Sequence, residues 1–215
     1  MARLKNGIFG GMQGRAGSLE GYILNGQYIL RSCKTRTKKP PTEKQLAVRK
    51  KMALTNNLLN VFSSFVRVGF GPAAVGKTYN AYTAAISYQL KYPITGAYPD
   101  YVIDYSKVRV TEGFMRTENV NPAVTLRDGA LHFTWTPEWN HLHSEDRSML
   151  LAYAPALNDA VYEICGTRRS TGRDVLKLPM DWEGVTIEIY FSFISEDRTR
   201  CMNSFYLGQA IIPAL

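Results

Sequence analysis

The sequence predicts an α+β protein of 215 residues, in which an N-terminal β-hairpin and two helices precede an antiparallel β-sandwich. Asn25-Gly26 lies between two apolar runs, which is typical of a hairpin turn. Apolar residues recur at helical spacing between about residues 42 and 90. From residue 101 onward, short apolar runs alternate with turn sequences, as in a sandwich. We therefore expect a glycine-rich hairpin, a basic linker and a helical region over residues 1–100, and a β-sandwich over residues 101–215.

The hairpin is predicted over residues 21–30, because Asn-Gly favours the positive φ angles of a type I′ turn. Five further glycines precede it, and two interpretations of them stay open. They are sites where the chain bulges or where another backbone comes close, or they belong to a flexible arm. The five are Gly7, Gly10, Gly11, Gly14 and Gly17.

The first helix is expected to begin at Thr42, because Thr42-Glu43-Lys44-Gln45 has the spacing of a capping box. It could continue to about Val66. Its first turns are basic, and its second half carries an apolar stripe at Leu54, Leu58, Val61, Phe62 and Phe65. A second helix is expected over residues 79–90, before Pro93.

The C-terminal half is predicted to consist of short strands. One or two are expected over residues 101–110. Seven more are expected at 123–126, 131–135, 149–154, 160–165, 174–178, 185–194 and 204–212. Turn sequences such as Arg127-Asp128-Gly129 and Glu183-Gly184 separate them. Strands at this spacing favour an antiparallel sandwich.

One short stretch holds the net charge of the chain. Nine basic residues and one acid, Glu43, lie between positions 31 and 51, and their balance equals the +8 of the whole chain. A basic segment on a neutral body indicates an acidic partner, such as a phosphate backbone, an acidic protein surface or an anionic membrane. The candidate contact residues are Arg31, Lys34, Arg36, Lys38, Lys39, Lys44, Arg49, Lys50 and Lys51.

Two motifs suggest chemistry, and each has a simpler explanation. Gly71 to Thr78 matches the letters of a P-loop, but a helix is expected before it where a P-loop needs a strand. A helix–helix loop in which Gly76 permits a turn explains it better. His141 and His143 could face one side of a strand, yet no third metal ligand is evident. The sequence therefore favours a protein without catalytic residues, cofactor or metal.

The tyrosines bear on the functional class of the protein, and the cysteines bear on its cellular compartment. The chain has 13 tyrosines, many of them near the basic segment. Such residues suit either base stacking or protein–protein interfaces, and we favour assembly. Three cysteines without a CxxC spacing indicate a reducing compartment. Neither a membrane-spanning run nor a signal peptide is evident, so we expect a protein that is cytoplasmic when synthesised and that can then become part of a virion or particle.

The C-terminal half resembles a fibronectin type III module. Residues Leu131 to Pro137, with Trp135 in the middle, look like its B strand, in which a tryptophan anchors the core between the sheets. Leu178-Pro179, Gly184 and the run Ile187 to Phe193 are similar to its E–F corner and F strand. The resemblance implies an Ig-like sandwich with Trp135 and Tyr190 in its core.

The whole chain also resembles an uncharacterised family of small basic bacterial and phage-associated proteins. The residues that carry this resemblance are 4–11, 31–49, 98–107 and 204–208. The family has no assigned activity, but its glycine-rich start, basic linker and capped helix resemble those of phage structural proteins. The resemblance therefore implies an assembly role.

Together these observations favour a non-enzymatic structural or assembly protein, such as a component of a phage-like virion or another multi-subunit particle. Its expected partners are copies of itself or other particle subunits. The alternative is a nucleic-acid-binding protein that uses residues 31–51 on phosphates.

Overall fold

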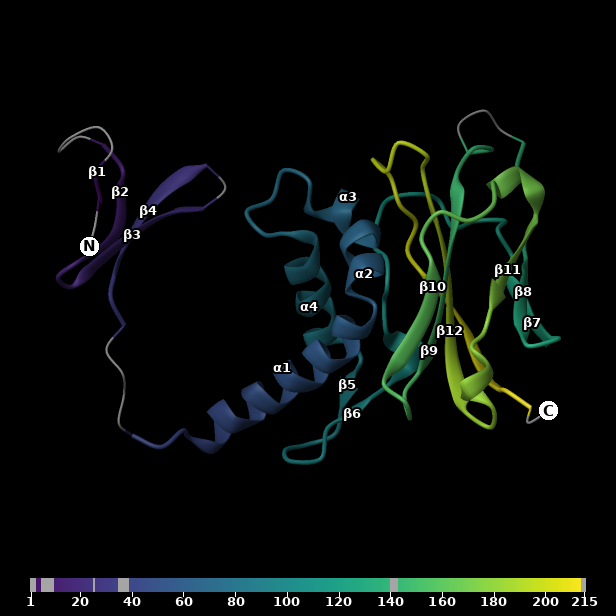
Figure 1. Cartoon of the computed structure of the whole chain (residues 1–215), viewed down its shortest axis with the longest axis horizontal. Coiled ribbons are helices and arrows are strands. Elements are labelled where there is room, and N and C mark those ends of the chain that lie inside the picture. Colours follow the sequence, from purple (N-terminus) through teal and green to yellow (C-terminus); the bar gives the residue numbers. More distant parts are fainter. Residues whose placement is uncertain (1–2, 5–9, 25, 35–38, 140–142, 214–215) are drawn as a thin grey trace. The chain divides into compact units, whose positions relative to one another are not determined.

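The computed structural model describes residues 3–4, 10–24, 26–34, 39–139 and 143–213 (Figure 1). The chain is α+β, as predicted from the sequence. It divides into two compact units, Met1–Thr42 and Glu43–Leu215. None of the described helices is long and apolar enough to span a membrane.

The N-terminal unit is an antiparallel sheet in the order β1-β2-β3-β4. Its strands are β1 (Arg3–Leu4), β2 (Met12–Ala16), β3 (Leu19–Leu24) and β4 (Gln27–Ser32). The predicted hairpin is confirmed as β3 and β4, which pair from Leu24↔Gln27 to Leu19↔Ser32. Gly26 has a φ of +79°, as the turn requires, while Asn25 lies outside the described residues.

Four helices begin the second unit. They are α1 (Glu43–Val61), α2 (Ser63–Gly69), α3 (Gly71–Ala74) and α4 (Ala81–Lys91). The single helix expected to reach Val66 is therefore interrupted at Phe62, whose φ and ψ are −121° and 39°. The break changes the direction of the chain, and Phe62 and Phe65 are both fully buried. Asn80 caps the N-terminus of α4, and its Oδ1 accepts a hydrogen bond from the Thr83 amide at 2.8 Å.

Nine strands follow the helices. They are β5 (Ile94–Thr95), β6 (Val102–Ile103), β7 (Ala123–Arg127), β8 (Ala130–Thr134), β9 (Arg147–Ala154), β10 (Asp159–Glu163), β11 (Arg173–Lys177), β12 (Thr186–Ile194) and β13 (Phe205–Ile211). The seven predicted strands from residue 123 onward are confirmed. Over residues 101–110 only β6 is a strand, because Asp104 accepts a hydrogen bond from the Ser106 amide and opens a 3₁₀ turn over Tyr105–Lys107.

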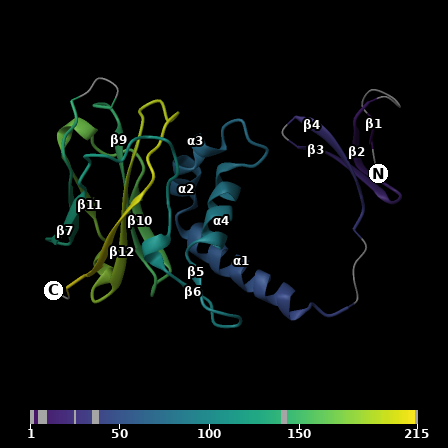
Figure 2. The same ribbon diagram turned by 180° about the vertical axis from the view of Figure 1, so that it is seen from behind.

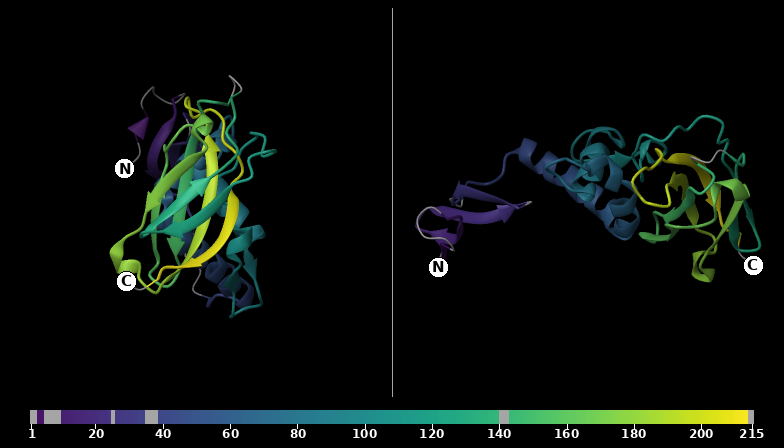
Figure 3. Two further views of the ribbon diagram at one scale, coloured as in Figure 1. Left: turned by 90° about the vertical axis from the view of Figure 1, so that its right-hand side faces the viewer. Right: turned by 90° about the horizontal axis from the view of Figure 1, so that it is seen from above.

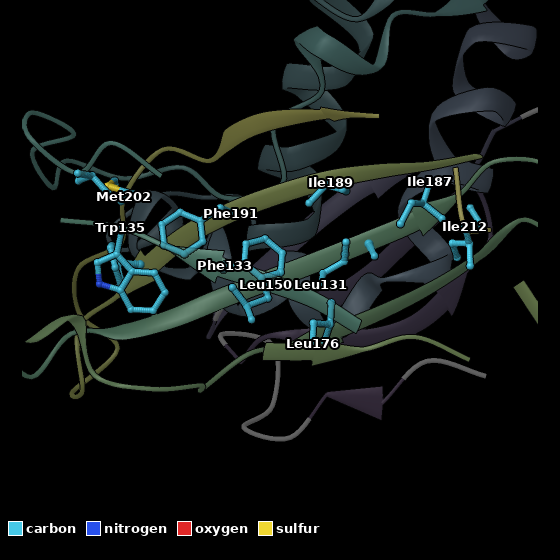
Figure 4. Packing of buried hydrophobic residues seen from close by; sticks show 14 of the residues in the cluster. Leu131, Phe133, Trp135, Leu150, Leu176, Ile187, Ile189, Phe191, Met202 and Ile212 are labelled. Carbon is cyan, nitrogen blue, oxygen red and sulfur yellow. The ribbon is translucent and has the colours of Figure 1, made fainter. Parts of the chain in front are cut away.

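The larger strands form two antiparallel sheets, one ordered β10-β9-β12-β13 and the other β11-β8-β7. Side chains from both sheets form one buried cluster (Figure 4). Trp135 is 5% exposed within it, and its ring centroid lies 5.3 Å from those of Phe191 and Phe193. Its Nε1 donates to the Arg169 carbonyl at 2.7 Å. A buried tryptophan of this kind needs such a partner for its N–H.

A second buried cluster lies between the helices and the other face of the four-stranded sheet (Figures 2 and 3). Phe62 and Phe65 of the helical layer make edge-to-face contacts with Tyr153 of β9 and Tyr162 of β10. Tyr190 belongs to this cluster, with its hydroxyl donating to the Tyr105 carbonyl at 2.8 Å. Tyr190 was expected between the two sheets, but alternation along β12 turns it to the helical side while Phe191 faces the sandwich.

The second cluster also moves the boundary between units. We expected a division near residue 100, with the helices on one side of it. The helices instead share a core with β9 and β12, so the compact unit begins at Glu43. Separating them would expose Met149, Leu151, Tyr153 and Tyr190 to water.

Truncating Phe62 tests this shared core. We expect Phe62→Ala to lower the free energy of unfolding by about 3–5 kcal/mol, because it leaves a cavity between helix and sheet. Urea unfolding followed by helical circular dichroism and by tryptophan fluorescence should give coincident transitions. The matched control, Val48→Ala, removes an exposed apolar side chain of α1. Two separate transitions would contradict a single unit from Glu43 to Leu215.

The buried tyrosines predict a loss of stability at high pH. Burial raises the pKa of Tyr153 from 10.0 to about 12. Between these two values the unfolded chain releases the phenolic proton while the folded chain keeps it, so stability is complete below pH 10 and falls as the pH rises. We expect ionisation of this one tyrosine in the unfolded chain to lower the free energy of unfolding by about 1 kcal/mol at pH 11. Urea titrations at pH 8 and 11 should show a smaller loss for Tyr153→Phe than for the wild type. An equal loss in both would contradict the assignment.

Candidate assembly surface

The N-terminal sheet has one strongly apolar face. Side chains directly opposite each other in an antiparallel pair share a face, and successive residues alternate. The pairings Ala16↔Leu19, Gly21↔Leu30 and Ile23↔Tyr28 therefore place apolar groups together on one side. Leu19, Ile23, Tyr28 and Leu30 are 42–58% exposed. We call this surface the apolar face, defined by Ala16, Leu19, Ile23, Tyr28 and Leu30.

The opposite face carries polar contacts beside Tyr22, Ile29 and the half-exposed Leu24. Arg31 pairs with Glu20 across the strands, and its Nη2 lies 2.7 Å from the Glu20 carboxylate. The same guanidinium lies over the ring of Tyr22, 5.2 Å from its centroid. The hydrogen bond that Arg31 donates to the Glu20 carboxylate raises the pKa of Arg31. These contacts distinguish the two faces and leave the apolar one without equivalent interactions among its described members.

Two glycines allow the strands and rings to approach closely. A Cβ at Gly11 would overlap the ring of Tyr28, and a Cβ at Gly21 would overlap the backbone oxygen of Met12. At Gly11 the close neighbour is thus a side-chain ring, where we expected a bulge, another backbone or a flexible arm. Gly21 is the only buried residue among those described in this unit, and it has no side chain.

The N-terminal unit thus has no buried side chain in its described part. A sheet gains independent stability from a hydrophobic face packed against something else. A unit of about 40 residues without disulfide, metal or partner is also at the lower limit of independent folding. Strand β4 ends the sheet, so alternate backbone groups of Gln27–Ser32 point outward at its edge. Both the face and the edge are surfaces that a second chain could cover.

The predicted basic residues do not form one site. Lys34, Lys39, Lys44, Arg49 and Lys50 are exposed, whereas Arg36 and Lys38 lie outside the described residues. Arg31 is engaged by Glu20 within the sheet. Lys51 is half-buried, with its Nζ 4.8 Å from the centroid of the Tyr101 ring.

The cations of α1 also surround the helix. At 100° per residue, Lys44 and Lys51 lie on the side that is buried further along at Thr55 and Leu59. Arg49 and Lys50 lie on the other side. The exposed apolar residues Leu46, Val48 and Met52 alternate with them. The first turns of α1 are thus a mixed basic and apolar surface on all sides.

The sequence that resembles a P-loop has a different structure. Helix α2 precedes it, residues Gly71–Ala74 form α3, and the Lys77 amide donates to the Ala74 carbonyl at 3.1 Å. A phosphate cradle would need a preceding strand and free amides. Gly76 has a φ of +72°, which confirms the expected turn between helices. The side chain of Lys77 lines a groove beside α4.

The histidine and cysteine side chains that the structure describes are not grouped into a site. His141 lies outside the described residues, and the Nδ1 of His143 lies 3.1 Å from the Asp146 carboxylate. Within the described ranges, no three His, Cys, Asp or Glu side chains are grouped as a metal site. Cys201 is buried, and burial raises the pKa of its thiol to about 11. Cys33 and Cys165 carry free thiols.

The fold and these surfaces define an α+β protein with a separate N-terminal sheet whose described side chains form no buried core. The chain belongs to DUF6266, a family of unknown function whose model matches residues 11–208. This confirms the expected membership of an uncharacterised family. Comparison with curated proteins and with solved structures gave no match.

Sequence reasoning emphasised the charge and missed the apolar face. The signal was present, because Leu19, Gly21 and Ile23 alternate with Glu20 and Tyr22 along one strand. The return strand continues the pattern with Tyr28 and Leu30. Which pairs share a face depends on the register of the hairpin, and the alternation does not say whether that face is covered.

Proposed function

We propose that this protein is a non-enzymatic assembly protein, in which the N-terminal sheet packs its apolar face against another subunit. The observation that carries the proposal is the absence of any buried side chain among the described residues of that sheet. Burying Leu19, Ile23, Tyr28 and Leu30 contributes up to ~1.5–3 kcal/mol for each side chain. That gain would stabilise the sheet and the contact together.

The C-terminal half supports a role as a binding or spacing module. Its seven strands from β7 to β13 form a three-stranded and a four-stranded sheet around one buried cluster. We assign it a fibronectin type III-like sandwich, since this strand number and sheet division are typical of that class. Such a fold by itself specifies no chemistry.

We further propose that the assembly is a multi-subunit particle, such as a phage-like virion. The support is the combination of an unpaired sheet edge, an exposed apolar face and a basic stretch near the joint between the units. These features suit a subunit that shares strands or faces with its neighbours. The purified chain would then associate with itself.

Leu30→Lys tests the apolar face. Leu30 is 58% exposed in the single chain, so the substitution should change folding little. It should weaken association about tenfold or more, because it removes a buried leucine and places a charge in the contact. The measurement is light scattering after size exclusion over a dilution series.

Gln27→Lys is the matched control, because Gln27 is exposed on the same strand and lies on the opposite face. We expect it to associate as the wild type does. A wild-type chain that remains monomeric at about 50 µM would contradict the proposal. If Leu30→Lys associates as strongly as the wild type, the apolar face is not the contact surface of the proposed assembly.

The alternative function is nucleic-acid binding through the basic stretch. The observation that favours it is the exposure of Lys34, Lys39, Lys44, Arg49 and Lys50 on both sides of residues 35–38. Such cations can reach phosphates whatever the sequence of the nucleic acid. A subunit facing packaged nucleic acid could combine both functions.

Salt dependence tests this alternative. Five phosphate contacts would give a slope of about −4 in a plot of log affinity against log salt. Changing Lys44, Arg49 and Lys50 together to alanine should reduce the slope by about 3. The control variant changes Arg127 and Arg173, two exposed cations of the three-stranded sheet, to alanine. If no binding is detected at 50 mM salt, the alternative fails.

A further inference from the structure

A groove of about 590 Å³ runs beside α4. Lys77, Lys91 and Arg109 line it, with Glu112 as the one carboxylate among its lining residues. Arg109 is held in place, because its guanidinium lies 4.4 Å from the centroid of Tyr88 and 3.8 Å from the Glu112 carboxylate. The groove therefore presents net positive charge, with Arg109 held at a fixed position.

Aromatic side chains line the same groove. Tyr79, Tyr88, Tyr92 and Phe114 all line it. Tyr88 and Tyr92 lie against each other, with ring centroids 4.6 Å apart. Phe114 is 96% exposed, the highest value among the large apolar side chains described. The groove, which we call the α4 groove, thus suits a partner that carries an apolar group beside carboxylates.

The turn between β11 and β12 has that composition. Met180 is 87% exposed, second only to Phe114 among the large apolar side chains described. Asp181 lies within the same 3₁₀ turn and Glu183 follows it directly, and both are exposed. We call Met180, Asp181 and Glu183 the acidic knob. Methionine sulfur makes favourable contacts with aromatic rings, and the two carboxylates oppose the charge of the groove.

The acidic knob is rigid, which favours binding. Trp182, within the same turn, is fully buried and anchors it in the core between the sheets. The Val185 amide donates to the Trp182 carbonyl at 3.1 Å, and the Gly184 amide donates to the Ile212 carbonyl at 2.8 Å. Because the backbone of the turn is already held, binding has little further backbone entropy to lose.

The acidic knob and the α4 groove are on different sides of one unit. Helix α4 belongs to the layer that covers one face of the four-stranded sheet (Figures 1 and 3). The knob joins strands of both sheets and is hydrogen-bonded to the C-terminal segment at Ile212. The knob therefore lies at an end of the sandwich and the groove lies beside the helical layer, so we assign the contact between them to two copies of the chain.

We propose that the α4 groove receives the acidic knob of a second copy of this chain. The inference rests on the proposed assembly function and adds a second, head-to-tail contact to it. Such a heterologous contact repeats and extends an assembly, whereas contact through one shared face closes it at a dimer. Each contact is small, and the two act together through effective concentration.

A charge exchange in the full-length chain tests the proposal. One variant is Lys77→Glu with Lys91→Glu, and the other is Asp181→Lys with Glu183→Lys. In each variant alone, the groove and the knob carry charge of the same sign and repel each other. The measured mass should therefore not exceed that of the species formed through the N-terminal sheet. An equimolar mixture should regain wild-type assembly, because every contact between unlike copies pairs opposite charges. Light scattering measures all three samples.

Arg127→Glu with Arg173→Glu is the control, since it makes the same change in charge on exposed positions of the three-stranded sheet. It should assemble as the wild type does. If the two test variants assemble fully when alone, or if the mixture fails to recover while both variants are folded, the knob-in-groove contact is wrong and the N-terminal contact stands. A monomeric wild type would overturn both.

Discussion

The four-stranded sheet β10-β9-β12-β13 is the constraint on which the second unit depends, because its central strands are covered on both faces. Alternate residues of β9 and β12 face the three-stranded sheet, and the others face the helices. Every residue of β9 from Ser148 to Ala154 is buried, and so is every residue of β12 from Ile187 to Ile194. Neither the helical layer nor the three-stranded sheet can leave without exposing one of these faces.

Buried polar groups of β12 are satisfied within the same arrangement. Glu188 is buried on β12 and accepts hydrogen bonds from the Tyr206 hydroxyl and the Gln209 amide at 2.7 and 2.8 Å. The Ser192 and Thr111 hydroxyls are 2.8 Å apart, and each lies within reach of the Met202 carbonyl. These bonds connect β12 to β13 and to the segment before β7. They explain how a doubly covered sheet tolerates a carboxylate and hydroxyls in its interior.

The N-terminal unit is the opposite case. Its four strands have a regular register and an amphipathic division of side chains, but its described residues supply nothing that covers the apolar face. The acidic knob and the α4 groove show a similar pattern in the second unit, where the two most exposed large apolar side chains lie beside opposite charges. In each unit, a set of exposed apolar groups thus lies in a surface of definite composition, which is a property of interaction sites.

Local features of the sequence determined much of this structure. Turn chemistry and alternation placed the hairpin and the seven strands from residue 123 onward, and the B-strand pattern identified Trp135 as buried. Other features depended on packing between distant residues. The interruption at Phe62, the helical side taken by Tyr190 and the boundary at Glu43 follow from helices covering a sheet that is formed about 90 residues later. The composition likewise showed how much charge residues 31–51 carry, and only the tertiary structure decided that Arg31 and Lys51 are engaged within the chain, because their partners come from the opposite strand and from a loop after α4.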